Sequence, residues 1–231
     1  MSTAIVVTCE HASRALPEEV GDLGLTGDVL SSHVAWDPGA APIARALSAR
    51  LAAPCELGAF SRLLVDLNRS ADNPSVIPEV AFGVPVPGNQ SLSGADRAHR
   101  IATWHQPYWQ RVESLLREGI ERAGTCLHVS IHSFTPELDP DRRTFPIGLL
   151  FKPDSELEGK VADRVARVLR ERGYGVEYNE PYPGTMDLII TGMRARLGGY
   201  LGLEIEINHA LMKGPWESPL VEALAAGVVA G

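Results

Sequence analysis

The sequence is poor in cysteine, and this scarcity argues against two kinds of site. Its 231 residues contain an odd number of cysteines, Cys9, Cys55 and Cys126, and no two of them form a Cys-x-x-Cys pair. Disulfide-dependent secreted domains carry even numbers of cysteines, and thiolate zinc sites carry closely paired ones. We therefore expect neither a disulfide framework nor a thiolate zinc site, and we expect a reducing, cytoplasmic environment.

Long apolar runs and an excess of basic residues are also absent. No stretch of eighteen apolar residues exists and no basic segment precedes the first apolar run, so we expect neither a membrane span nor a signal peptide. Lysine and arginine number 21 against 29 acidic residues, and the net charge of −8 disfavours nucleic acid and anionic membranes as partners. The sequence has no Gly-x-Ser-x-Gly elbow, which argues against a serine hydrolase.

What the sequence does contain is an ordinary globular composition, 45% hydrophobic and 22% charged, that suits a single domain over residues 1–231. Apolar runs predict strands at residues 4–8, 63–67, 125–131, 147–151, 175–178 and 201–207. Helical spacing predicts helices at residues 38–51, 94–123, 156–171 and 219–229, the second kinked or split at Pro107, and 71–93 reads as a long irregular loop. This alternation indicates an α/β fold with a mixed or mostly parallel central sheet.

Polar residues stand at the ends of three predicted strands. His11, His132 and Glu206 each come at or near the end of an apolar run, which is where open α/β sheets bind ligands. Two such histidines favour a metal, because imidazole is a common zinc ligand and a catalytic zinc needs only three protein ligands. His128 lies deeper in the strand of His132, and we interpret it as a core or supporting residue.

The third metal ligand has two candidates four residues apart. Asp37 stands just ahead of a predicted helix, where a plain N-cap is the simpler interpretation of an aspartate. His33 is the competing ligand. We prefer Asp37 and keep His33 as the alternative.

Asn68 and Arg69 follow a predicted strand and form a candidate anion-binding pair. An amide beside a planar guanidinium suits bidentate recognition of a carboxylate. Arg62 precedes Arg69 by seven residues, and a surface ion pair between Arg62 and Asp66 is an equally good interpretation of that spacing.

Glu204 and Glu206 alternate within an apolar strand and therefore point to the same face. A carboxylate inside such a strand is costly to bury unless it is paired or functional. A glutamate beside a zinc-bound water can accept its proton and later deliver it to a leaving amine.

Five motifs occur in an order that resembles one family. They are Cys-Glu-His-Ala-Ser, Trp-Asp-Pro-Gly-Ala, Phe-Ser-Arg-Leu-Leu-Val-Asp-Leu-Asn-Arg, Ser-Ile-His-Ser-Phe-Thr-Pro and Glu-Ile-Asn-His-Ala-Leu-Met. From about Val6 to Met212 the chain resembles the N-formylglutamate amidohydrolases. The resemblance implies a three-layer αβα fold similar to the zinc-dependent exopeptidases, and cleavage of an N-acyl amino acid such as N-formylglutamate.

The resemblance also implies roles for individual residues. Asn68 and Arg69 would hold the α-carboxylate of the substrate, with Arg62 assisting. Glu206 aligns with the glutamate of the family's closing motif, so we prefer it to Glu204 as the general base. With His11, Asp37 and His132 as ligands, we expect one zinc ion, or another divalent metal, per chain.

Four further residues are weaker candidates for the pocket. Ser133 can orient the scissile carbonyl, although an ordinary serine turn is the simpler interpretation. Arg143 can neutralise a side-chain carboxylate or the developing oxyanion, and a solvated basic turn explains it equally well. Tyr182 and Thr185 belong to a segment that resembles a substrate-covering loop, in which Tyr182 can donate to the acyl oxygen.

One departure from the family leaves the exact substrate open. His209-Ala-Leu-Met follows Asn208, where formylglutamate hydrolases tend to carry arginine and then Ala-Leu-Tyr-Met. The expected partner is a small anionic N-acyl amino acid. Two functions compete with this prediction: an amidase of larger, peptidoglycan-type amides, and a non-catalytic amino-acid-binding domain on the same scaffold.

Overall fold

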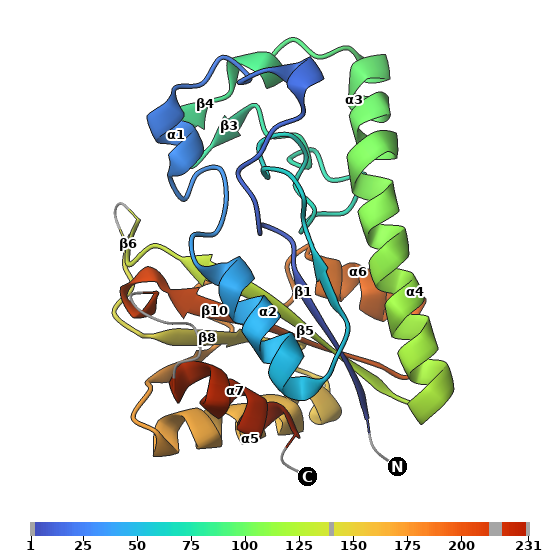
Figure 1. Ribbon diagram of the computed structural model, residues 1–231, viewed down its shortest axis with the longest axis vertical. Helices are drawn as coiled ribbons and strands as arrows, with labels where there is room; N and C mark the ends of the chain where they lie inside the picture. Colours follow the sequence, from blue (N-terminus) through green and yellow to red (C-terminus); the bar gives the residue numbers. More distant parts are fainter. Residues whose placement is uncertain (1–2, 139–140, 213–218, 230–231) are drawn as a thin grey trace.

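The apolar runs of the sequence form a six-stranded mixed sheet in the computed structural model, which describes residues 3–138, 141–212 and 219–229 (Figure 1). In spatial order the strands are β2 (Cys55–Leu57), β1 (Ala4–Cys9), β5 (Cys126–Phe134), β10 (Tyr200–Asn208), β8 (Ile147–Leu150) and β9 (Val176–Tyr178). The first four run parallel, β8 is antiparallel to β10, and β9 is parallel to β8. The predicted mixed, mostly parallel sheet is confirmed, and the carboxyl ends of β1, β5 and β10 share one edge.

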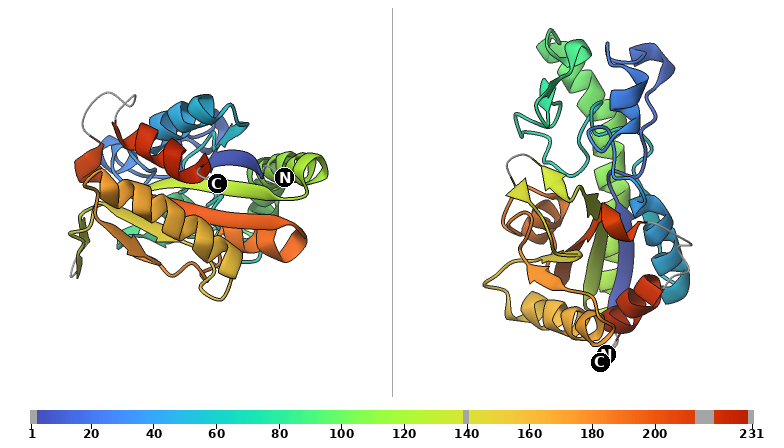
Figure 2. Two further views of the ribbon diagram at one scale, coloured as in Figure 1. Left: turned by 90° about the horizontal axis from the view of Figure 1, so that it is seen from below. Right: turned by 90° about the vertical axis from the view of Figure 1, so that its left-hand side faces the viewer.

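Helices cover both faces of this sheet and complete the predicted three-layer αβα arrangement (Figure 2). One face carries α2 (Ala40–Leu51), α5 (Glu156–Glu171) and α7 (Pro219–Val229), and the other carries α4 (Gln106–Ala123) and α6 (Ile189–Arg196). In α5, for example, Val161, Val165 and Leu169 recur every four residues and are buried against the core. Burying each such side chain contributes roughly 1.5–3 kcal/mol. None of the helices in the described part of the chain is both long and apolar enough to cross a membrane.

A smaller group of elements lies beyond the carboxyl edge of the sheet, at the top of Figure 1. We call residues 16–36 and 59–100 the cap. Its elements are α1 (Gly27–Ser31), α3 (Gly94–Arg100) and the hairpin of β3 (Val80–Ala81) with β4 (Val84–Pro85). Leu23, Val34, Leu63 and Val86 form a separate apolar cluster inside the cap. The predicted irregular loop at 71–93 thus contains a short hairpin.

The remaining elements are short. Two strands, β6 (Glu137–Leu138) and β7 (Asp141–Arg142), pair antiparallel. Single 3-10 turns occupy Glu18–Val20, Pro87–Asn89 and His209–Leu211.

The predicted long helix is widened near its proline, not split. A π-helical turn at Ile101–His105 joins α3 to α4, and the amide of Gln106 donates to the carbonyl of Ile101, five residues earlier. In a regular helix, a proline ring collides with the carbonyl four residues before it. Pro107 directly follows the wider turn, which accommodates the ring while the helix continues.

The predicted strand at 63–67 is wrong, because this segment forms consecutive turns. The amide of Leu64 donates to the carbonyl of Ser61, and the amide of Leu63 donates to the Ser61 hydroxyl oxygen. Both leucines are nevertheless fully buried, packed against helix α4 and within the cap. An apolar run shows that a segment is buried, and here its partners are helices and loops instead of a neighbouring strand.

Candidate active site

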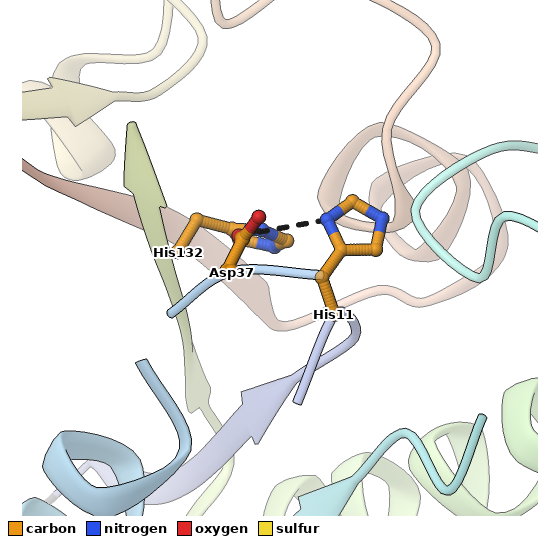
Figure 3. A group of neighbouring side chains, drawn as sticks. All are labelled: His11, Asp37 and His132. Carbon is orange, nitrogen blue, oxygen red and sulfur yellow. Dashed lines mark hydrogen bonds and ion pairs between the residues drawn. The ribbon is translucent and has the colours of Figure 1, made fainter. Parts of the chain in front are cut away.

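Three side chains from different elements converge at the carboxyl edge of the sheet (Figure 3). His11 lies two residues beyond β1, His132 lies near the end of β5, and Asp37 lies three residues before α2. Because β1 and β5 are parallel neighbours, their ends bring the two histidines together. All three side chains are buried, and one possible ligand atom from each lies within 4.8 Å of the other two.

The Asp37 carboxylate faces both imidazole rings. Its Oδ2 atom is 2.8 Å from Nδ1 of His132 and 3.6 Å from Nδ1 of His11. Its Oδ1 atom forms an ion pair with the Arg62 guanidinium. Gly39, not Asp37, is the N-cap of α2, so the N-cap interpretation does not hold.

A second carboxylate holds the far nitrogen of each ring. Nε2 of His11 lies 2.7 Å from Oδ1 of Asp66, and Nε2 of His132 lies 2.9 Å from Oε2 of Glu10. A carboxylate in this position keeps the ring proton on Nε2 and leaves the lone pair of Nδ1 free for a metal. Nδ1 of His11 is buried and has no hydrogen-bond partner among the described residues. Nδ1 of His11, Nδ1 of His132 and Oδ2 of Asp37 together match the donor set of a catalytic zinc site.

The charges around the two rings act in opposite directions. Burial and the nearby Arg62 guanidinium lower the pKa of His11 to about 4. Burial also opposes ionisation of His132, but the surrounding carboxylates, first Glu204 and then Glu10, outweigh it and raise its pKa to about 9. The pKa of Glu10 falls well below its usual range, because its bond and attraction to His132 exceed the effect of burial. This concentration of buried negative charge favours a cation.

Two glutamates of β10 lie beside these ligands. Glu206 is paired in register with His132, and Glu204 with Ser130. Glu204 accepts a hydrogen bond from Nδ2 of Asn68 at 3.3 Å, whereas Oε2 of Glu206 is buried without any partner in the described ranges. Burial and the adjacent Glu204 raise the pKa of Glu206 to about 7, against the opposing effect of His132. A carboxylate with a free oxygen and a pKa near neutrality suits a general base.

These residues open onto a cavity of about 230 Å³. Arg62, Arg69 and Arg143 contribute cationic groups to its lining, and Val80 and Phe82 of the cap hairpin contribute an apolar wall. The cavity therefore combines a cluster that could hold a metal ion, a buried carboxylate and cationic groups that attract anions.

The predicted carboxylate clamp lies in this cavity, but one half of it is already engaged. The side-chain amide of Asn68 donates to Glu204 and accepts from the amide of Ile189. Arg69 donates from Nη1 to the carbonyl of Asp187 at 3.0 Å and is about one quarter exposed. Arg69 is thus the better placed of the pair to contact an anion.

The weaker candidates divide into residues inside and outside the cavity. Ser133 lines it, but its amide donates to Asp37 and its hydroxyl donates to the carbonyl of Pro38, so it supports the cluster. Arg143 lies over the ring of Tyr182 at 5.1 Å and donates to its hydroxyl at 3.4 Å, and both line the cavity. Thr185 is exposed and is not part of the lining.

Neither His33, the alternative third ligand, nor His128, the predicted core or supporting residue, belongs to the ligand cluster. His33 lines the cavity with its ring 5.4 Å from that of Phe82. His128 is fully buried and contacts the hydroxyls of Thr8 at 2.8 Å and Tyr200 at 2.9 Å, as expected of a satisfied core residue.

Two residues at the site have no assigned role in the sequence interpretation. In the sequence, Glu10 is simply the neighbour of His11. Asp66 is interpreted there only as a possible ion-pair partner of Arg62. The available signal is an acidic residue inside or directly after an apolar run, since such a residue is costly to bury without a partner.

Comparisons with known proteins identify a family. The model of the N-formylglutamate amidohydrolase family matches residues 3–212. The structure of an Agrobacterium tumefaciens gene product is 33% identical with a TM-score of 0.87, over 98% of this chain and 90% of that one. An N-formylglutamate amidohydrolase from Ralstonia eutropha shares the fold, with 20% identity and a TM-score of 0.72 over 98% and 92% of the chains. No curated protein matched in the sequence comparison. Because the family model spans most of its length, the chain belongs to the N-formylglutamate amidohydrolase family.

Proposed function

We propose that this amidohydrolase is a single-domain enzyme that uses one zinc ion to cleave the N-acyl amide of a small anionic amino acid, with N-formylglutamate as the first candidate. His11, Asp37 and His132 would hold the ion. The observation that carries the proposal is that two buried atoms of residues lining one cavity, Nδ1 of His11 and Oε2 of Glu206, have no hydrogen-bond partner among the described residues. Buried polar atoms rarely lack partners unless a ligand supplies them.

The chemistry divides between the ion and the side chains. When bound, zinc would polarise the amide carbonyl and lower the pKa of a water molecule. Glu206 accepts the proton that this water loses as its oxygen bonds to the carbonyl carbon. Glu206 then returns that proton to the leaving nitrogen as the carbon–nitrogen bond breaks. The products are a carboxylic acid and a free amine.

Substrate recognition falls to the cationic lining. Arg69 would bind the α-carboxylate, with Arg62 nearby, because a guanidinium matches a carboxylate in charge and geometry. Arg143 and Tyr182, already in contact with each other, form a second polar group for a side-chain carboxylate or the acyl oxygen. A cavity of about 230 Å³ favours a small substrate over a bulky peptidoglycan amide.

The test is a panel of N-formyl and N-acetyl amino acids incubated with zinc-reconstituted protein, with release of free amine as the readout. We expect acidic N-formyl amino acids to be cleaved fastest, and metal-free protein to be inactive. A zinc-loaded protein that binds these compounds but releases no amine would instead be a binding module. A preference for amino acids with uncharged side chains would contradict the binding of a side-chain carboxylate by Arg143 and Tyr182.

A further inference from the structure

We propose that Glu10 is a positioning residue for the metal centre and that Tyr108, on helix α4, holds it in place. Neither residue lines the active-site cavity. The inference rests on the proposed function, because it takes His132 as a metal ligand.

Glu10 directly follows β1 and is completely buried, with donors on both carboxylate oxygens. Oε1 accepts from the Tyr108 hydroxyl at 2.9 Å. Oε2 accepts from the Ser130 hydroxyl at 2.5 Å and from Nε2 of His132 at 2.9 Å. Burying a carboxylate is expensive even when it is paired, and an apolar residue would serve stability equally well. The arrangement is better explained by what Glu10 does to His132.

The His132 ring lies between two carboxylates that compete for its proton. Asp37 approaches Nδ1 at 2.8 Å, and Glu10 approaches Nε2 at 2.9 Å. If Glu10 were absent, a neutral ring would keep its proton on Nδ1 and donate it to Asp37. Two of the three ligand atoms would then be bonded to each other. With Glu10 in place a proton stays on Nε2, so Nδ1 is the ring nitrogen that can exchange its proton for a metal beside the Asp37 oxygen.

Tyr108 fixes the other side of Glu10. It lies just after the π-helical turn, is 1% exposed, and packs in the apolar cluster between α4 and the sheet. Its hydroxyl donates to Oε1, so the carboxylate cannot rotate away from His132 without losing this bond. Helix α4 therefore supports the metal centre through a chain of two hydrogen bonds, from Tyr108 to Glu10 and from His132 to Glu10.

The experiment measures zinc affinity by chelator competition, and the absorption spectrum of the cobalt-substituted protein, in purified full-length variants. We expect Glu10→Gln to weaken zinc binding by about 10- to 100-fold, since the amide can donate to His132 as well as accept. Tyr108→Phe removes only the anchor and should give a smaller loss with an altered cobalt spectrum.

Two matched controls separate positioning from loss of stability. Glu158 is another buried carboxylate, and it forms an ion pair with Arg194. Tyr200 is another buried tyrosine, and its hydroxyl contacts His128. Glu158→Gln and Tyr200→Phe should leave zinc affinity and the cobalt spectrum unchanged.

The outcomes distinguish this inference from the proposed function. If the unmodified protein binds no zinc, the proposed function fails. If it binds zinc and folded Glu10→Gln binds equally well, the positioning role of Glu10 is overturned. Should Glu10→Gln fail to fold, Tyr108→Phe decides: an unchanged affinity and an unchanged cobalt spectrum would overturn the proposal.

Discussion

The sheet and the cap contribute different halves of the site. His132, Glu204 and Glu206 belong to central strands whose neighbours on both sides fix their positions. Arg62 and Arg69 belong to turns of the cap, which lack strand partners. Under the proposed function, the sheet half would hold the metal and the base, and the cap half would recognise the substrate. Changes in the sheet half should therefore affect kcat, and changes in the cap half should affect KM.

Side chains from helix α4 and from the π-helical turn before it hold the cap segment that lacks strand partners. The indole of Trp109 donates to the carbonyl of Leu67 at 2.9 Å, and Nε2 of His105 lies 2.7 Å from the carbonyl of Arg69. The segment carrying Arg69 is thus held by side chains instead of a backbone ladder. Rigid sites on loops depend on such supports.

The largest effect should come from the sheet half. Glu206→Gln keeps the shape of the side chain but removes its ability to accept and return a proton. We expect kcat to fall by about 10²- to 10⁴-fold while KM and zinc content change little. Steady-state kinetics with metal analysis of the same sample checks this. Turnover near that of the unmodified enzyme would remove Glu206 as the base.

The sheet half should also carry a pH-dependent part of the stability. Burial lowers the pKa of His128 from 6.5 to about 4 in the folded protein. Because the unfolded chain binds the proton more tightly, this contribution is full above about pH 6.5 and is lost as pH falls toward about pH 4. It amounts to about 3 kcal/mol.

Urea unfolding of metal-free protein between about pH 7 and pH 4 tests this dependence. We expect the free energy of unfolding of His128→Gln to fall less steeply with acid than that of the unmodified protein. His99→Gln, which replaces an exposed histidine, provides the control for removing a histidine as such. Parallel curves for His128→Gln and the unmodified protein would contradict the account.

In the cap half, Arg69→Ala should raise KM more than it lowers kcat. Loss of a hydrogen bond to a charged group costs roughly 1.5–3 kcal/mol, so kcat/KM should fall by about 10- to 100-fold. The sharper measurement repeats the assay with a substrate whose α-carboxylate is blocked as an amide. The variant and the unmodified enzyme should cleave this substrate at similar rates. An equal loss on both substrates would mean that Arg69 acts on the fold or the chemistry.

The smallest effect on stability should come from the cap hairpin. Phe82 and Gly83 form its two-residue turn, both with positive φ, and Phe82 is 42% exposed with the Arg62 guanidinium 5.8 Å from its ring. Asparagine tolerates this conformation better than phenylalanine, and Asn-Gly is a preferred pair for such turns. Phe82→Asn should change the free energy of unfolding by less than about 1 kcal/mol.

The same variant removes an apolar wall of the cavity, so we expect KM to rise without a change in kcat. Urea unfolding and steady-state kinetics on one preparation give both numbers. A large loss of stability, or a fall in kcat alone, would show that the hairpin supports the sheet half.

The sheet half could be predicted from the sequence more fully than the cap half. His11 and His132 could be placed because a buried parallel strand must end at the same edge as its neighbours, so the residues that follow it are brought together. The run 63–67 has the same apolar character but forms turns, because its burial comes from helix α4 and the cap. An apolar run indicates that a segment is buried, but it does not indicate which elements pack against that segment.

Supporting residues are the hardest to read from sequence. Glu10 is next to His11 in the chain, yet its carboxylate contacts the ring of His132, 122 residues away. Asp66 is near Arg62 in the chain, and its carboxylate contacts the ring of His11. Such contacts depend on the tertiary arrangement of β1, β5 and the cap. Spacing along the chain therefore cannot predict them.

The central claim is that one metal ion joins the two histidines and the aspartate. A crystal of the zinc-loaded protein, with anomalous diffraction recorded on both sides of the zinc absorption edge, tests it most directly. We expect one peak per chain, bound by Nδ1 of His11, Oδ2 of Asp37 and Nδ1 of His132. A peak held by other residues, or no peak at this cluster in protein that cleaves N-acyl amino acids, would contradict it.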